Sequence, residues 1–205
     1  MAGTTDYRNR SRRGEPVWEL AEIEYPLQGC WTEGQFLRRD FKVGVEFVDG
    51  CLEFLPMPTE KHQAITKFFF LALNLFVSNY KLGIVHFEGL RVRTRPGAIR
   101  LPDVVFLKRE NGAKRHNDAW QGADLAFEAV SAGGEERDLE TKREEYAAAG
   151  ISEYWIADFE RGTVTVLALK GKKYVEHCTS KRGDVANSKL LPGFAVNVKE
   201  LFDAE

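Results

Sequence analysis

The order of a strand, a helix and a second strand between residues 123 and 158 most constrains how this chain can fold. The runs "ADLAFEAV" (123–130) and "EYWIAD" (153–158) are apolar and strand-like. Between them, residues 137–149 read "RDLETKREEYAAA", a composition typical of a helix. A helix that crosses between strands is characteristic of a sheet covered by helices. The sequence therefore predicts an α/β domain with a central mixed β-sheet flanked by helices.

The regions on either side of this unit add further elements to the predicted domain. Residues 43–58, "VGVEFVDGCLEFLPMP", alternate around Asp49-Gly50 and predict an N-terminal β-hairpin with a type I′ turn. A long apolar helix is expected from about Thr59 to Tyr80. The runs "TVTVLAL", "KYVEHCT" and "FAVNV" predict extra C-terminal strands. We expect one domain over residues 17–205, preceded by a disordered leader at 1–16 that is rich in arginine and polar residues.

Composition narrows the possible classes of protein. The formal net charge is −2 and the pI is about 6.2, so no global attraction to nucleic acid or to anionic membranes is expected, although a local basic patch remains possible. The three cysteines are far apart and no CxxC motif occurs, which argues against a disulfide scaffold or a structural zinc site. No stretch approaches the roughly 20 apolar residues of a membrane span. We expect a cytoplasmic protein that does not interact with a membrane.

Two carboxylates occupy unusual places in the predicted strands. Glu128 shares one strand face with Ala126 and Val130, and a buried glutamate needs a partner. Asp103 follows Pro102 and opens the apolar run "DVVFLK". A glutamate held by an arginine and a simple turn aspartate are the alternative interpretations. Together, however, two acids on neighbouring strands could converge on a hard divalent cation such as magnesium.

The helix after Glu128 presents a lysine between an acid and a phenol. Asp138, Lys142 and Tyr146 are spaced i, i+4 and i+8, so they share one helical face. A lysine on a helix usually lies on a solvated face. Because the helix must pack back against the sheet beside Glu128, Lys142 could instead point towards Glu128 and Asp103. There it could orient a water nucleophile or stabilise charge on a phosphate.

Taken together and in order, these segments resemble a known family. "VEFVDGCLEFLPMPTEKHQAI", "LPDVVFL", "ADLAFEAVS", "RDLETKREEYAAAGISEYWIAD" and "LPGFAVNVKELF" are similar to the Uma-type family of restriction-endonuclease-like proteins, within the PD-(D/E)xK nuclease superfamily. The resemblance covers about residues 36–202 and implies a restriction-endonuclease-like fold. This sequence departs from the family's common pattern at "EAVSAGG", where "E-V-L-S-P-S" is frequent in the family.

The resemblance also implies a site. Asp103 and Glu128 match the two metal-binding acids, with a backbone carbonyl near Ala129 as a further ligand of Mg²⁺ or Mn²⁺. Val130 stands where the superfamily lysine is usual, and the family pattern moves that lysine to Lys142. Three further positions match the family pattern: Asp138 and Tyr146 beside the lysine, and Glu46 as a possible additional carboxylate. His62 matches a family position to which no role is assigned.

Two functions remain open. The first is a magnesium-dependent endonuclease acting on DNA, with candidate DNA contacts in the basic runs at residues 91–100 and 108–116, although these are also typical of solvated loops. The second is a non-catalytic binding or assembly protein on the same nuclease scaffold.

The helix at about 59–80 carries more apolar surface than one sheet face can cover, which predicts a homodimer. The competing expectation is that the hairpin and residues 17–37, with Trp18, Trp31 and Phe36, cover this helix within one chain.

Overall fold

The computed structural model describes residues 25–130 and 140–205 and has the predicted α/β architecture. Its centre is a six-stranded mixed sheet. In spatial order the strands are β10 (Lys173–Lys181), β9 (Thr163–Lys170), β8 (Glu153–Asp158), β7 (Leu125–Val130), β6 (Val104–Lys108) and β3 (Gly83–Phe87). Among the described strands of this sheet, only β7 and β8 pair in parallel, and α4 (Lys142–Ala148) lies between them in the chain. The predicted crossover is therefore confirmed, although residues 137–139 of the expected helix lie outside the described residues.

Strand β7 is buried along its whole length because both faces of the sheet are covered. Leu125, Phe127 and Ala129 point into the hydrophobic cluster on the side of α3 (Glu60–Asn79). Ala126 and Val130 belong to the cluster on the opposite side, which also contains residues of α4. Because side chains alternate along a strand, Glu128 must share the α4 side with Ala126 and Val130. The alternation predicted from the sequence is thus confirmed.

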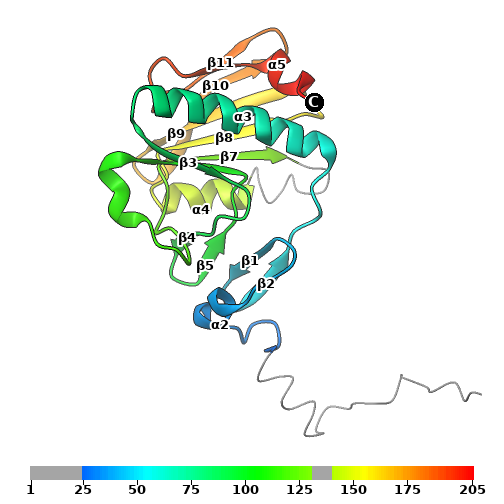
Figure 1. Ribbon diagram of the computed structural model, residues 1–205, viewed down its shortest axis with the longest axis vertical. Coiled ribbons are helices and arrows are strands. Elements are labelled where there is room, and N and C mark those ends of the chain that lie inside the picture. Colours follow the sequence, from blue (N-terminus) through cyan, green and yellow to red (C-terminus); the bar gives the residue numbers. More distant parts are fainter. Residues whose placement is uncertain (1–24, 131–139) are drawn as a thin grey trace, which may run out of the picture.

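Helix α3 begins after Thr59, whose hydroxyl accepts a hydrogen bond from the backbone N–H of His62. The helix crosses one face of the central sheet (Figure 1), and Phe69 stacks on Phe127 with ring centroids 3.9 Å apart. The C-terminal part of the chain packs against the same helix: Phe194 contacts both Phe69 and Phe76. This part contains a separate two-stranded sheet, β11 (Val185–Asn187) with β12 (Ala195–Asn197), and α5 (Val198–Asp203).

A second, four-stranded sheet forms the other end of the molecule (Figure 1). Its order is β2 (Cys51–Phe54), β1 (Val45–Val48), β5 (Ala98–Arg100) and β4 (Val92–Arg95). The predicted hairpin is confirmed, since Asp49 and Gly50 both have positive φ, 46° and 83°, as a type I′ turn requires. Helix α2 (Glu33–Arg38) packs on this sheet through Phe36.

This packing corrects one expectation from the sequence. The hairpin and the described part of residues 17–37 do not cover α3, because their apolar side chains form a cluster of their own, made of Trp31, Phe36, Val45, Phe47, Leu52 and Ile99. The C-terminal segment covers α3 instead. Leu71 and Leu75 on α3 remain 57% and 63% exposed. The expected leader at 1–16, and Trp18, lie outside the described residues.

Several short elements had no sequence signal. These are α2, β5, β11, α5 and the 3₁₀ helix η2 (Arg109–Lys114), each only three to six residues long. Such segments are too short to show a hydrophobic period. Within the described ranges, no helix is both long and apolar enough to cross a membrane.

Candidate active site

Glu128 is a glutamate in the interior of the protein, with only 3% of its surface exposed. Its Oε1 accepts two hydrogen bonds from α4, from Nζ of Lys142 and from the hydroxyl of Tyr146, both at 2.8 Å. Lys142 and Tyr146 are one helical turn apart, so a single face of α4 supplies both donors. The arrangement confirms that Lys142 points at Glu128 rather than into solvent.

Lys142 is almost completely buried, with a side-chain exposure of 2%, and it has a second acidic neighbour. Oε1 of Glu46, from β1, lies 3.5 Å from its ammonium group. The same oxygen accepts a hydrogen bond from the backbone N–H of Leu101 at 3.0 Å. Lysine is rarely buried unless it is paired. The two glutamates, from β7 and β1, give this lysine the partners that burial demands.

Arg100 holds the other side of Glu46 and ties the small sheet to α4. Its Nη1 donates to Oε2 of Glu46 at 2.9 Å and to Oε2 of Glu53 at 2.7 Å. Its Nε and Nη2 both donate to Oε2 of Glu145, at 3.1 and 2.8 Å. Glu145 precedes Tyr146 on α4 and also hydrogen bonds the hydroxyl of Thr94. These contacts fix the rotation of α4 and hence the direction of its lysine and tyrosine.

The electrostatics of this network shift the pKa values of Glu46 and Tyr146 in opposite directions. Burial raises the pKa of Glu46, but the positive charges of Lys142 and Arg100, with the hydrogen bonds from Leu101 and Arg100, more than offset this and leave it at about 2. Burial raises the pKa of Tyr146 well above its usual value, and the charge of Glu128 adds to the effect. Glu46 is therefore a carboxylate at neutral pH, and Tyr146 is a neutral donor.

Asp103 lies beside this network at the start of β6. Its Oδ2 accepts a hydrogen bond from the backbone N–H of Ala129 at 2.8 Å and lies 3.1 Å from Nε2 of His62. The first contact ties Asp103 to the residue that follows Glu128. The second contact is made by His62, in the first turn of α3. No role could be assigned to His62 from the sequence, and the structure places it next to Asp103.

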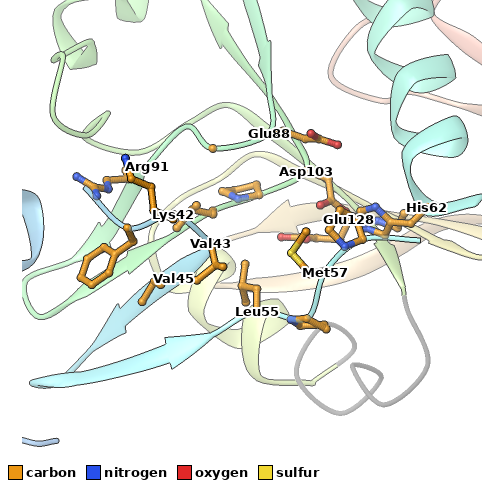
Figure 2. Close-up of a pocket in the computed structure, with 18 of the residues that line it drawn as sticks. Lys42, Val43, Val45, Leu55, Met57, His62, Glu88, Arg91, Asp103 and Glu128 are labelled. Carbon is orange, nitrogen blue, oxygen red and sulfur yellow. Dashed lines mark hydrogen bonds and ion pairs between the residues drawn. The ribbon is translucent and has the colours of Figure 1, made fainter. Parts of the chain in front are cut away.

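Asp103, Glu128, Lys142 and His62 line one cleft, which has a volume of about 670 Å³. Figure 2 shows Asp103, Glu128 and His62 gathered at one end of it, and Arg91 at the other. Ala129 also lines this cleft. Glu46 and Tyr146 are fully buried and do not line the cleft. Asp138 lies outside the described residues.

The basic run at 91–100 is largely used within the protein. Arg93 pairs with Glu33 at 2.6 Å and Arg95 with Asp49 at 2.7 Å, while Arg100 is buried among glutamates. This is a physical reason to discount these three as DNA contacts. Arg91 differs from them, because it lines the cleft.

The main residue that sequence reasoning missed is Arg100. It ends a three-residue strand and looks like one more cation of a basic run, so composition gave no sign of its burial. The one available signal was the presence of Glu46 and Glu53 on the expected hairpin. Glutamates at a buried sheet require a cationic partner nearby.

The depressed pKa of Glu46 gives a testable dependence of stability on pH. The pKa is about 2 in the folded protein against an ordinary value of 4.5, so the unfolded chain binds more protons between these values. This carboxylate should contribute about 3 kcal/mol to the free energy of unfolding above pH 4.5, a contribution that is lost as the pH falls towards 2. The free energy of unfolding of Glu46→Gln should therefore fall less steeply than that of the unmodified protein as the pH decreases over this range. Urea denaturation at several pH values measures this difference.

A matched control is Glu176→Gln, which removes an exposed glutamate of β10. It should follow the pH dependence of the unmodified protein. If Glu46→Gln also follows that dependence, then Glu46 does not have the electrostatic role described above.

Comparisons with known proteins agree with this architecture. A family model described as "Uma2: Putative restriction endonuclease" matches residues 34–199. A similar solved structure is the crystal structure of a putative nuclease belonging to DUF820 from Anabaena variabilis ATCC 29413. The two are 18% identical with a TM-score of 0.69, and the match covers 84% of this chain and 98% of that chain. This confirms the restriction-endonuclease-like fold.

No curated protein matches the sequence. Because the family match spans most of its length, the chain belongs to the Uma2 family of putative restriction endonucleases.

Proposed function

We propose that this protein is a metal-dependent endonuclease that hydrolyses phosphodiester bonds of DNA in the cleft lined by Asp103, Glu128 and Lys142. The observation that carries this proposal is the buried ammonium group of Lys142, held 2.8 Å from Glu128 at the edge of that cleft. The family and the structural neighbour, both described as putative nucleases, support a nuclease function.

The donor set suits a hard divalent cation. Mg²⁺ is usually bound by one or two carboxylates together with waters, and here two carboxylates and the backbone of Ala129 line the same cleft. In the described residues no group of three or more His, Cys, Asp or Glu side chains could hold a metal. The proposed site therefore depends on the two acids, the Ala129 carbonyl and solvent.

A divalent cation would supply chemistry that the side chains of the cleft do not. A bound Mg²⁺ or Mn²⁺ would lower the pKa of a water ligand and reduce the negative charge on a phosphate. Asp103 and Glu128, with the Ala129 carbonyl, would hold it.

The remaining residues stabilise charge on the phosphate or orient the side chains that do so. The ammonium group of Lys142 places a positive charge at the cleft, where a phosphate undergoing attack gathers negative charge. Tyr146 acts as a positioning residue, because its hydroxyl donates to Glu128 and it does not reach the cleft. Asp138, one turn before Lys142 in the sequence, is proposed to orient the lysine as well. Glu46 supports Lys142 from the protein side.

The alternative is a non-catalytic binding or assembly protein on this scaffold. A binding module has no physical need to bury a lysine between two glutamates beside a third carboxylate. Replacing a buried ion pair by apolar residues is often neutral or stabilising, so the cluster is not explained by stability alone. We therefore favour the catalytic proposal, and metal binding separates the two.

Replacing the acids should remove metal binding and cleavage together. We expect Asp103→Asn and Glu128→Gln each to abolish Mn²⁺ binding in calorimetry and Mg²⁺-dependent cleavage of DNA, because each removes a negative charge from the metal site. Lys142→Met should reduce cleavage by about 100-fold or more, as loss of a charge-stabilising donor does, while Mn²⁺ binding remains.

The matched control is Asp40→Asn, which removes an acid from the same cleft, where it pairs with Lys42. Its side chain is 83% exposed, so the change should leave folding and Mn²⁺ binding intact. Metal binding that survives Glu128→Gln would contradict the proposal and favour the non-catalytic alternative.

We further propose that the protein is a homodimer that buries the exposed face of α3. Leu71 and Leu75 are one helical turn apart and remain 57% and 63% exposed. A two-fold symmetric contact is the commonest way to bury such a face.

Sedimentation velocity at micromolar protein should give a dimer mass for the unmodified chain. The double change Leu71→Arg and Leu75→Arg should give a monomer, because it places charges in the proposed contact. Phe54→Arg, which replaces an equally exposed apolar residue of the hairpin, should leave the dimer intact. A monomer mass for the unmodified chain would refute the dimer.

A further inference from the structure

The cleft extends well beyond the two acids. Its volume of about 670 Å³ lies within the range of sites that enclose a whole small molecule, roughly 300–1,000 Å³. Asp103 and Glu128 lie at one end of it (Figure 2). A single phosphate and a cation would occupy only that end, so the rest of the wall is available to another part of a ligand.

The middle of the wall is apolar and open to solvent. Val43, Leu55 and Met57 line it, and Figure 2 shows them between the acids and Arg91. Val43 is 44% exposed and Met57 is 77% exposed. The backbone N–H of Leu55 donates to the carbonyl of Gly44 at 2.9 Å, which extends the pairing of the hairpin and holds this wall in place. Clefts that bind small molecules are lined mostly by apolar side chains with a few polar groups, and this cleft has that combination.

The far end of the cleft carries a cation in a fixed position. Nη1 and Nη2 of Arg91 donate to the backbone carbonyls of Leu37 and Arg39, both at 3.0 Å. Its guanidinium carbon also lies 4.7 Å from the ring centroid of Phe36. These contacts hold the charged plane in one orientation. Along the cleft, the two acids are thus followed by an apolar wall and then by Arg91, while the charged side chains of Asp40, Lys42 and Glu88 also line it.

This order suits one nucleotide unit of an unpaired strand. A scissile phosphate would lie at the acids, the exposed base would lie against the apolar wall, and the neighbouring phosphate would meet Arg91. In a duplex the bases are stacked and paired inside, so the backbone next to a scissile phosphate presents little to an apolar wall. An unpaired base presents a flat apolar face that stacks on such surfaces.

We infer that the cleft accepts an unpaired nucleotide beside the scissile phosphate, so that the substrate is single-stranded DNA or an unpaired stretch within a duplex. This inference rests on the proposed phosphodiesterase function. It assigns Val43, Leu55 and Met57 to base contact and Arg91 to the next phosphate.

Binding in a calcium buffer tests the inference without relying on cleavage. We would measure the fluorescence anisotropy of a labelled single-stranded oligonucleotide and of its blunt duplex at one salt concentration. The single strand should bind at least about fivefold more tightly, in keeping with the energy of one base stacked on a protein side chain. Met57→Gln should remove most of this preference, and Met57→Leu should retain it. Phe54→Gln, which changes an exposed apolar residue outside the cleft, should have no effect.

Duplex binding as tight as single-strand binding would overturn the inference, as would failure of both DNAs to bind. Equal weakening of both by Met57→Gln would overturn the inference too.

A cleavage assay in Mg²⁺ separates this inference from the proposed function. Preferential single-strand binding without cleavage would support the cleft assignment and refute the nuclease proposal. Faster cleavage of the blunt duplex would refute the cleft assignment and leave the nuclease proposal standing.

Discussion

The ammonium group of Lys142 lies 2.8 Å from Glu128 and 3.5 Å from Glu46, and it is almost completely buried at the wall of the cleft. Burying a charge costs several kcal/mol unless partners compensate, so this lysine dictates much of its surroundings. Glu128 must occupy a central strand, and Glu46 must approach from a second sheet. Glu46 in turn requires Arg100, which also holds α4 through Glu145.

The fold supplies these positions by simple rules. The parallel pairing of β7 and β8 requires a crossover, and the crossover places α4 on the face of β7 to which Glu128 points. The start of β6 brings Asp103 next to the backbone of Ala129, and the start of α3 brings His62 to Asp103. Elements far apart in the sequence thus converge on one end of a cleft. The hairpin contributes both the buried Glu46 and the exposed apolar wall of that cleft.

Local patterns were sufficient to predict the hairpin, α3, β7 and the crossover helix, because each depends on alternation or helical spacing along a short segment. The direction of Lys142 did not follow from helical spacing alone, and the nearby acids Asp103 and Glu128 were needed to suggest it. The pairing of Asp103 with His62 and the burial of Arg100 depend on contacts between residues 40 or more positions apart. No local pattern encodes such contacts. The competing expectation, that the hairpin and residues 17–37 cover α3, is wrong for the described residues for the same reason: only the topology places the C-terminal segment on this helix.

The proposed function requires that Asp103 and Glu128 hold a divalent cation next to Lys142. A crystal of the protein soaked in Mn²⁺, with anomalous scattering used to locate the ion, tests this requirement. We expect an anomalous peak within bonding distance, roughly 2.0–2.3 Å, of carboxyl oxygens of both acids, with Lys142 still in contact with Glu128. A fully soaked crystal without a peak between these carboxylates, or with the ion bound only elsewhere, would contradict it.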